Sequence, residues 1–144
     1  LKQSAMRTPF QFIIVDDDPT SNLVCEYTIA STYGAAETKA YVEPTAALEY
    51  LRKEFQPDAA TTTTLLLDIN MPGMDGWEFM QAFSKLDSDI KSAIRVYILS
   101  SSTNEDDIQK AASIPEVEGF LNKPFLHNGH TSNSNRPYFR ELVC

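Results

Sequence analysis

Short apolar segments alternate with longer segments of helical periodicity along most of this chain. The expected strands are residues 10–15, 39–42, 64–67, 94–99 and 117–121. Most of them are apolar throughout rather than alternating with polar residues, so both faces of these strands are expected to be buried. Such strands, separated by helices, are typical of a parallel sheet covered on both faces. Because crossovers between parallel strands are right-handed, we expect an open, doubly wound five-stranded sheet of the α/β class.

Helix signals fill the intervals between these strands, and those of the first helix are the clearest. Asp18, followed by proline, is expected to start this helix as its N-cap, and Gly34 is expected to end it. Its apolar residues at three- and four-residue steps are Leu23, Tyr27, Ala30 and Tyr33. That spacing is typical of the packed face of a helix. Later helices are expected after Glu43, after Gly76 and after Asn104.

The net charge limits the functions open to the chain. Twelve Lys and Arg against twenty Asp and Glu give a formal net charge of −8 and a pI near 4.6. Phosphate backbones and anionic membranes repel such a chain, so it is not expected to bind nucleic acid or a membrane directly. The 144 residues predict one domain, and no apolar run approaches the roughly 20 residues of a membrane span.

The cysteines and the N-terminal residues favour a cytoplasmic protein. Cys25 and Cys144 form no spacing motif, so a disulfide scaffold is not expected and a reducing cytoplasm is the expected compartment. No signal-peptide pattern opens the chain.

Polar residues follow four of the five expected strands closely. Asp16 and Asp17 follow the first strand and Asp68 the third. Ser100 follows the fourth strand and Lys123 the fifth. In open parallel sheets, ligands bind beyond the carboxyl ends of the strands, so these side chains are expected to meet at one edge. Taken singly, each residue also fits a helix cap, a turn or a solvated charge; their shared placement favours a functional site.

Three carboxylates at one edge need a counter-charge. At ~4 Å and an effective dielectric of ~20, each like-charged pair repels by about 4 kcal/mol. Lys123 can supply one positive charge, and a divalent cation can supply two more. Few protein ligands and open positions favour Mg²⁺ over Ca²⁺. A carboxylate held beside such a cation can act as a nucleophile toward phosphorus.

Four short segments stand out by their order and spacing. They are Ile14-Val-Asp-Asp-Asp-Pro19, Leu66-Leu-Asp-Ile-Asn-Met-Pro-Gly-Met-Asp-Gly76, Ile98-Leu-Ser100 and Phe120-Leu-Asn-Lys-Pro-Phe125. Together they resemble the receiver domain of bacterial two-component response regulators, and the stretch from Asp68 to Gly76 is the most specific. The resemblance covers about residues 10–125 and implies a flavodoxin-like sheet with strand order 2-1-3-4-5.

The resemblance implies roles for the acidic residues at the sheet edge. Asp68 corresponds to the phosphoacceptor that takes a phosphoryl group from a sensor histidine kinase or a phosphotransfer protein. Asp17 corresponds to a direct Mg²⁺ ligand, and Asp16 to its partner through a water molecule. Asn70 is expected to offer its backbone carbonyl to the same cation.

The resemblance also implies a switch. Ser100 corresponds to the hydroxyl residue that moves to bind the phosphoryl group, and Lys123 to the lysine that pairs with that group. Phe120 falls at the aromatic position whose rotamer follows the hydroxyl residue; it also fits a plain core side chain. Phosphorylation is then expected to shift the population toward a state with a new face for a downstream protein partner.

The C-terminal residues depart from the family pattern. The family has an amphipathic fifth helix directly after its lysine-proline motif, whereas residues 126–137 have loop composition. We therefore expect a receiver domain at 10–125, a flexible or artificial N-terminus at 1–9, and an atypical polar tail at 126–144 with the fifth helix atypical or missing. Three explanations of this tail are open: a late short helix, a partner or swapped element that covers the bare sheet face, and a non-native tail. A homodimer is compatible with the swapped element.

Three functions fit these residues. The first is a receiver that is phosphorylated on Asp68. The second is a pseudo-receiver that binds proteins without phosphorylation, and the complete set of polar residues argues against it. The third is an aspartate-dependent phosphatase, which would carry an acidic proton donor where Asn70 stands. We therefore expect slow hydrolysis of the chain's own aspartyl phosphate and no enzymatic turnover of an external substrate.

Overall fold

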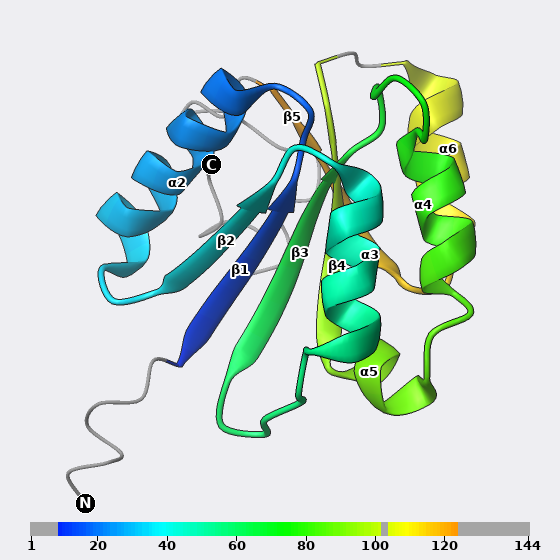
Figure 1. The fold of residues 1–144 in the computed structure, drawn as a ribbon. Coiled ribbons are helices and arrows are strands. Elements are labelled where there is room, and N and C mark those ends of the chain that lie inside the picture. The colour runs from blue at the N-terminus through cyan, green and yellow to red at the C-terminus, as the bar shows by residue number, and fades with distance from the viewer. Residues whose placement is uncertain (1–8, 102–103, 124–144) are drawn as a thin grey trace, which may run out of the picture.

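The computed structural model describes residues 9–101 and 104–123, which form a five-stranded parallel sheet flanked by helices (Figure 1). The strands are β1 (Phe10–Val15), β2 (Glu37–Tyr41), β3 (Thr62–Asp68), β4 (Ile94–Ser100) and β5 (Val117–Asn122). The helices in these ranges are α2 (Pro19–Tyr33), α3 (Pro44–Lys53), α4 (Gly76–Phe83), α5 (Ser88–Ser92) and α6 (Glu105–Ala112). The expected strands and longer helices are present with small shifts of their bounds, and the short helix α5 was not expected.

The sheet has the strand order β2-β1-β3-β4-β5, and all neighbouring strands are parallel. This confirms the doubly wound, flavodoxin-like topology. The order reverses between β1 and β3, because the chain moves outward to β2 and then returns past β1 to β3. Such a reversal places a crevice at the carboxyl ends of β1 and β3, which is where ligands bind in open α/β sheets.

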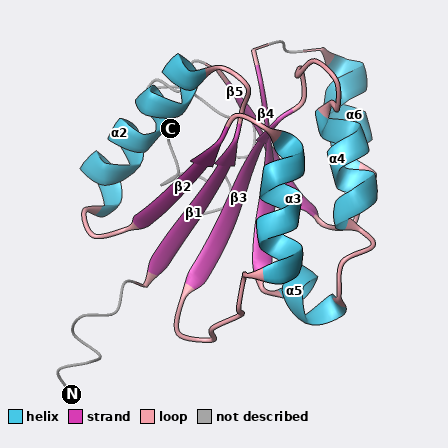
Figure 2. Cartoon of the chain, in the orientation of Figure 1, coloured by secondary structure: helices cyan, strands magenta, loops and turns pink. Residues whose placement is uncertain are grey.

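Apolar layers fill both faces of the sheet. The larger layer packs the strands against α3, α4, α5 and α6, and its residues Leu51, Phe79 and Phe83 are completely buried. The smaller layer joins β1, β3, β4 and β5 to Cys25 and Ile29 of α2. Figure 2 shows α2 on the opposite side of the sheet from α3 and α4. Burial on both faces explains why the strands are apolar throughout.

Helix α2 begins and ends as expected, but it packs on a different face. Asp18 is its N-cap and accepts a hydrogen bond from the Thr20 amide at 3.0 Å, and Gly34 ends it with φ of +69°. The residues buried toward the sheet are Asn22, Cys25 and Ile29. By contrast, Leu23 and Tyr27 are 66% and 75% exposed. The expected face was wrong because α2 has apolar residues on all sides, so spacing alone does not select one.

The expectation about cysteines stays a prediction. Cys25 is buried against the sheet. The other cysteine of the chain, Cys144, lies outside the described residues. Residues 1–8 and the tail 126–144 also lie outside the described residues, so the expectation about the fifth helix stays a prediction.

Candidate functional site

The carboxyl ends of β1 and β3 bring three carboxylates together. One carboxylate oxygen from each of Asp16, Asp17 and Asp68 lies within 4.8 Å of the other two. Asp16 and Asp68 are 1% and 5% exposed, and Asp17 is more exposed. Val15 lies opposite Leu67 in the parallel register. Asp16 and Asp68 are the residues that follow this pair, so the two carboxylates lie side by side at the carboxyl ends of β1 and β3.

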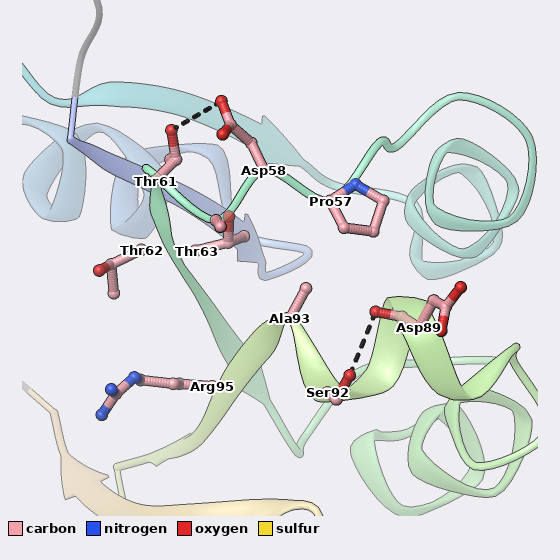
Figure 3. A pocket seen from close by; sticks show the side chains of 10 residues that line it. Pro57, Asp58, Thr61, Thr62, Thr63, Asp89, Ser92, Ala93 and Arg95 are labelled. Atoms are coloured by element: carbon pink, nitrogen blue, oxygen red, sulfur yellow. Dashed lines mark hydrogen bonds between the residues drawn. The ribbon is translucent and has the colours of Figure 1, made fainter.

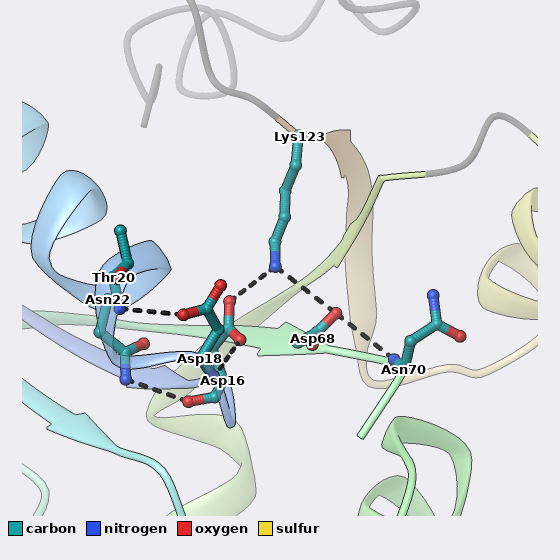
Figure 4. A network of polar contacts seen from close by, with 7 residues as sticks. All are labelled: Asp16, Asp18, Thr20, Asn22, Asp68, Asn70 and Lys123. Atoms are coloured by element: carbon teal, nitrogen blue, oxygen red, sulfur yellow. Dashed lines mark hydrogen bonds and ion pairs between the residues drawn. The ribbon is translucent and has the colours of Figure 1, made fainter. Parts of the chain in front are cut away.

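Lys123, directly after β5, brings a positive charge to this cluster (Figure 4). Its Nζ donates to Asp16 Oδ2 at 2.6 Å and lies 3.7 Å from Asp68 Oδ1. The Lys123 backbone amide donates to the Ser100 carbonyl at 2.7 Å, which ties the lysine to the end of β4. Since these charges are largely removed from solvent, the loss of one partner leaves the others uncompensated.

Asn22 supports Asp16 from helix α2, and sequence reasoning did not single it out. Its Nδ2 donates to the Asp16 backbone carbonyl at 3.0 Å, and the Asp18 amide donates to Asp16 Oδ1 at 3.0 Å. The two bonds hold both the backbone and the side chain of Asp16. No group in the described part of the chain donates a hydrogen bond to the buried Asn22 Oδ1. The only signal in the sequence is a polar residue just inside a helix start, and surface residues share that signal.

The loop after β3 is fixed to the start of α4. The Gly76 amide donates to the Ile69 carbonyl at 3.1 Å, and a Cβ placed on Gly76 would lie 2.7 Å from Ile69 Cα. Asp75 and Glu78 form a capping box, with each side chain accepting from the other's backbone amide at 2.9 Å. Asp75 and Gly76 therefore form a fixed helix start, which holds the backbone that follows Asp68.

Burial raises the pKa of Asp68 from 3.8 to about 6. The charge of Lys123 lowers this pKa, as does the Asn70 amide, which lies 3.4 Å from Asp68 Oδ1. The charges of Asp16 and Asp17 raise it. A carboxyl group with this pKa is mostly ionised at pH 7, so it can act as a nucleophile, and it changes charge close to neutrality.

The donor set fits a small divalent cation. Three carboxylates meet, and among residues 9–101 and 104–123 only Lys123 pairs with them, so these groups together keep a net negative charge. Mg²⁺ needs few protein ligands, because it retains several waters and prefers carboxylate and carbonyl oxygens. Asp16, Asp17 and Asp68 offer such oxygens. The Asn70 carbonyl belongs to the peptide segment next to Asp68 and is a further candidate ligand.

Ser100 and Phe120 lie on the neighbouring strands. Asp68 is opposite Leu99 in the register of β3 and β4, so Ser100 extends one residue beyond it, and Ser100 is completely buried. Phe120 is opposite Ile98, two residues before Ser100. Because side chains two residues apart on a strand share a face, Ser100 and Phe120 lie one step apart on the same face of the sheet.

A cavity of about 640 Å³ lies at the amino-terminal ends of β3 and β4, opposite the carboxylate site (Figure 3). Its lining includes Thr62 at the start of β3, Asp89 of α5 and Arg95 near the start of β4. Strand β3 is seven residues long. At about 3.3 Å per residue, roughly 20 Å separates this cavity from Asp68. The carboxylate site is therefore marked by its chemistry and not by a large cavity.

Comparisons with known proteins agree with this fold. The family model of the response regulator receiver domain matches residues 12–130. The chain belongs to this family, which confirms the resemblance seen in the sequence.

Solved structures have the same architecture. A response regulator receiver protein from Dyadobacter fermentans DSM 18053 is 26% identical, with a TM-score of 0.75 over 93% of this chain and 94% of that chain. A two-component response regulator from Cytophaga hutchinsonii is 25% identical, with a TM-score of 0.73 over 95% of this chain and 98% of that chain.

A curated relative is similar over a shorter stretch. The probable methanogenesis regulatory protein FilR2 of Methanothrix harundinacea (strain 6Ac) is 35% identical over 79 residues. These residues are 55% of this chain and 49% of the relative. The chain thus spans about half the length of this curated relative.

As a receiver domain, the chain belongs to two-component signalling. Receiver domains are generally regulatory rather than catalytic, and they bind Mg²⁺ at an acidic pocket. They interact with histidine kinases or phosphotransfer proteins and with downstream effectors. Among the helices of residues 9–101 and 104–123, none is long and apolar enough to cross a membrane.

Proposed function

We propose that Asp68 accepts a phosphoryl group from the phosphohistidine of a sensor histidine kinase or a phosphotransfer protein. Mg²⁺ would be held by Asp16, Asp17 and Asp68 together with the Asn70 carbonyl. The observation that carries this proposal is a buried, nucleophilic carboxylate inside a three-carboxylate cluster, with the Lys123 ammonium 3.7 Å away. A plain helix cap or turn does not need this combination.

The transfer step follows from these positions. An ionised oxygen of Asp68 attacks phosphorus, the bond between phosphorus and the imidazole nitrogen breaks, and the departing imidazole takes up a proton. When bound, Mg²⁺ would neutralise part of the charge on the phosphoryl oxygens. Lys123 is placed to exchange part of its contact with Asp16 for a phosphoryl oxygen. The Ser100 hydroxyl, at the end of the neighbouring strand, is placed to donate to another.

The response proposed for the domain is a shift between two states. When Ser100 turns toward the phosphoryl group, it leaves space on the face that it shares with Phe120. Phe120 is 8% exposed and belongs to the apolar layer under α6, so its inward rotation changes the surface formed by α6 and β5. A downstream protein that prefers this surface would then bind the phosphorylated form more tightly.

Helix α2 offers a docking surface for the phosphoryl donor. Leu23, Val24 and Tyr27 are 66%, 51% and 75% exposed, although all three are large and apolar. The helix begins directly after the acidic cluster, with Pro19 two residues beyond Asp17. We propose that a helix of the donor protein packs on this apolar face and so presents its phosphohistidine to Asp68.

The proposal is tested by phosphorylation with a small donor. Wild-type protein incubated with acetyl phosphate and Mg²⁺ should gain one phosphoryl group by intact mass, and EDTA should prevent it. Asp68→Asn should gain none, and Asp17→Asn should gain it at least about tenfold more slowly, because a metal ligand is lost. Glu49→Gln, which removes one exposed carboxylate elsewhere, should behave as wild type. No phosphoryl gain in wild type would instead favour the pseudo-receiver, a binding module without phosphorylation.

A further inference from the structure

A second surface of the domain is a shallow groove between α4 and α6, of about 220 Å³. The groove residues are Trp77, Met80, Gln81, Ser84, Lys110 and Ile114. Met80 is part of the buried core, and Trp77 and Ile114 pack against that core while remaining partly exposed. The floor of the groove is therefore apolar and rigid.

The charge of the groove is concentrated at Lys110. Its Nζ lies 5.0 Å from the centroid of the Trp77 ring, and it makes no ion pair in the part of the chain that the structure describes. Asp106, one helical turn earlier, is thus not within ion-pair distance. A lysine held over an aromatic ring beside an apolar floor can meet a carboxylate while its stem packs on the apolar part of a ligand.

The carboxylate of Glu116, beside Ser84 at the other end of the groove, already has partners. Glu116 accepts from Ser84 Oγ at 3.3 Å and lies 3.8 Å from Lys91 Nζ. Its negative charge is therefore already engaged. Among the described residues that line the groove, an incoming group meets apolar side chains, uncharged polar side chains and the positive charge of Lys110.

The size of the groove indicates what it accepts. Pockets for whole small molecules are usually about 300–1,000 Å³, so 220 Å³ suits one large side chain better than a complete ligand. Grooves between two helices are a common place for a partner helix to insert its apolar residues. A partly exposed tryptophan such as Trp77 can also supply much of the binding energy at an interface, where tryptophan is enriched among the dominant residues.

We propose that this groove binds a helical segment of a partner protein, which inserts one large apolar side chain over Trp77 and pairs a carboxylate with Lys110. The partner segment is therefore acidic as well as apolar. This inference concerns the unphosphorylated domain without Mg²⁺ and does not depend on the proposed phosphorylation of Asp68. The two proposals can fail independently.

The test uses a designed probe, since the partner is not identified. The probe is an alanine-based helical peptide with one leucine and, one turn before it, one glutamate; the control peptide has glutamine in place of glutamate. Binding to the metal-free protein is followed by Trp77 fluorescence and by backbone amide NMR shifts. The glutamate peptide should shift signals at Gln81, Lys110 and Ile114, and the glutamine peptide should bind about two- to fivefold more weakly, as for an exposed ion pair.

A charge reversal makes the test specific. Lys110→Glu should weaken the glutamate peptide further and should favour a peptide with lysine at that position. Lys53→Glu causes the same change in net charge at the end of α3, where Lys53 pairs with Glu49, and should leave the preference unchanged. The proposal is overturned by three results: no binding, equal effects of both substitutions, or shifts outside the groove. Tighter binding of 2-naphthylacetate than of the glutamate peptide would also overturn it, because the groove would then suit a small ligand.

Discussion

The ammonium of Lys123 donates to the carboxylate of Asp16 at 2.6 Å, across more than 100 residues of sequence. This bond joins the residue after β5 to the residue after β1, and both lie beside Asp68. In the cation-free domain, Lys123 therefore occupies a position from which it compensates part of the acidic cluster. Its contact with Asp68, at 3.7 Å, is the longer of the two and leaves Asp68 accessible as a nucleophile.

Lys123→Met should separate cation binding from phosphorylation. Removing the positive charge from the cluster should tighten Mg²⁺ binding by about tenfold or more, because a cation ~5 Å away is no longer repelled. Phosphoryl transfer from acetyl phosphate should nevertheless become slower, since one phosphoryl oxygen loses its partner. Mg²⁺ titration followed by Trp77 fluorescence measures the first effect, and intact mass over time measures the second. Lys53→Met, on an exposed pair, is the control; weaker Mg²⁺ binding in Lys123→Met would contradict this account.

Asp68→Asn should be more stable than wild type at neutral pH when EDTA removes cations. Because burial raises the pKa of Asp68 to about 6, the folded state holds this proton more tightly than the unfolded state. Stability is thus lost as pH rises from about 4 through 6. We expect a gain on the order of 1–2 kcal/mol at pH 7.5 after allowing for screening.

The same gain should shrink as pH falls through 6 and disappear below the ordinary pKa of 3.8, where Asp68 is protonated in both states. Urea unfolding of both proteins at several pH values measures it. A difference that stays constant with pH, or that grows as pH falls, would show that the charge of Asp68 is not the cause.

Much of the fold and site could be predicted because each signal was local. Strand ends place Asp16, Asp68 and Lys123 at one sheet edge whatever the details of packing, and the Asp18 and Gly34 caps act within one helical turn. The inner face of α2 could not be predicted, since apolar residues surround that helix. The close approach at Gly76 was missed for a related reason: it depends on two segments that meet only in the folded chain.

Gly76→Ala should disturb the site from outside the cluster. The added Cβ would lie 2.7 Å from Ile69 Cα and 2.9 Å from the Asp68 carbonyl oxygen, so backbone must move. We expect a loss of about 1–3 kcal/mol in unfolding free energy and slower phosphorylation of Asp68.

Gly34→Ala separates these two effects. It forces alanine into a positive φ with no atom within 4 Å of the new Cβ, so it should cost about 1–2 kcal/mol without changing the phosphorylation rate of the folded protein. If both variants slow phosphorylation equally, the contact between Gly76 and Ile69 does not position Asp68.

The exposed face of α2 should matter only for a protein donor. Replacing Leu23 and Tyr27 by serine removes two exposed apolar side chains, so stability should change by less than about 1 kcal/mol. Transfer from a phosphorylated histidine phosphotransfer protein should slow by about tenfold or more, which corresponds to roughly 1.4 kcal/mol of lost docking energy. Phosphorylation by acetyl phosphate serves as the internal control and should be unchanged. An equal loss with both donors would place the defect in the site and not in docking.

The position of the phosphoryl group is the most direct test of the central claim. Protein treated with acetyl phosphate and Mg²⁺ is reduced with borohydride, which converts an aspartyl phosphate to homoserine, and is then digested and sequenced by mass spectrometry. The account predicts homoserine at position 68 in Mg²⁺-treated wild type and none after EDTA. Homoserine at another aspartate, or incorporation that persists in Asp68→Asn, would contradict it.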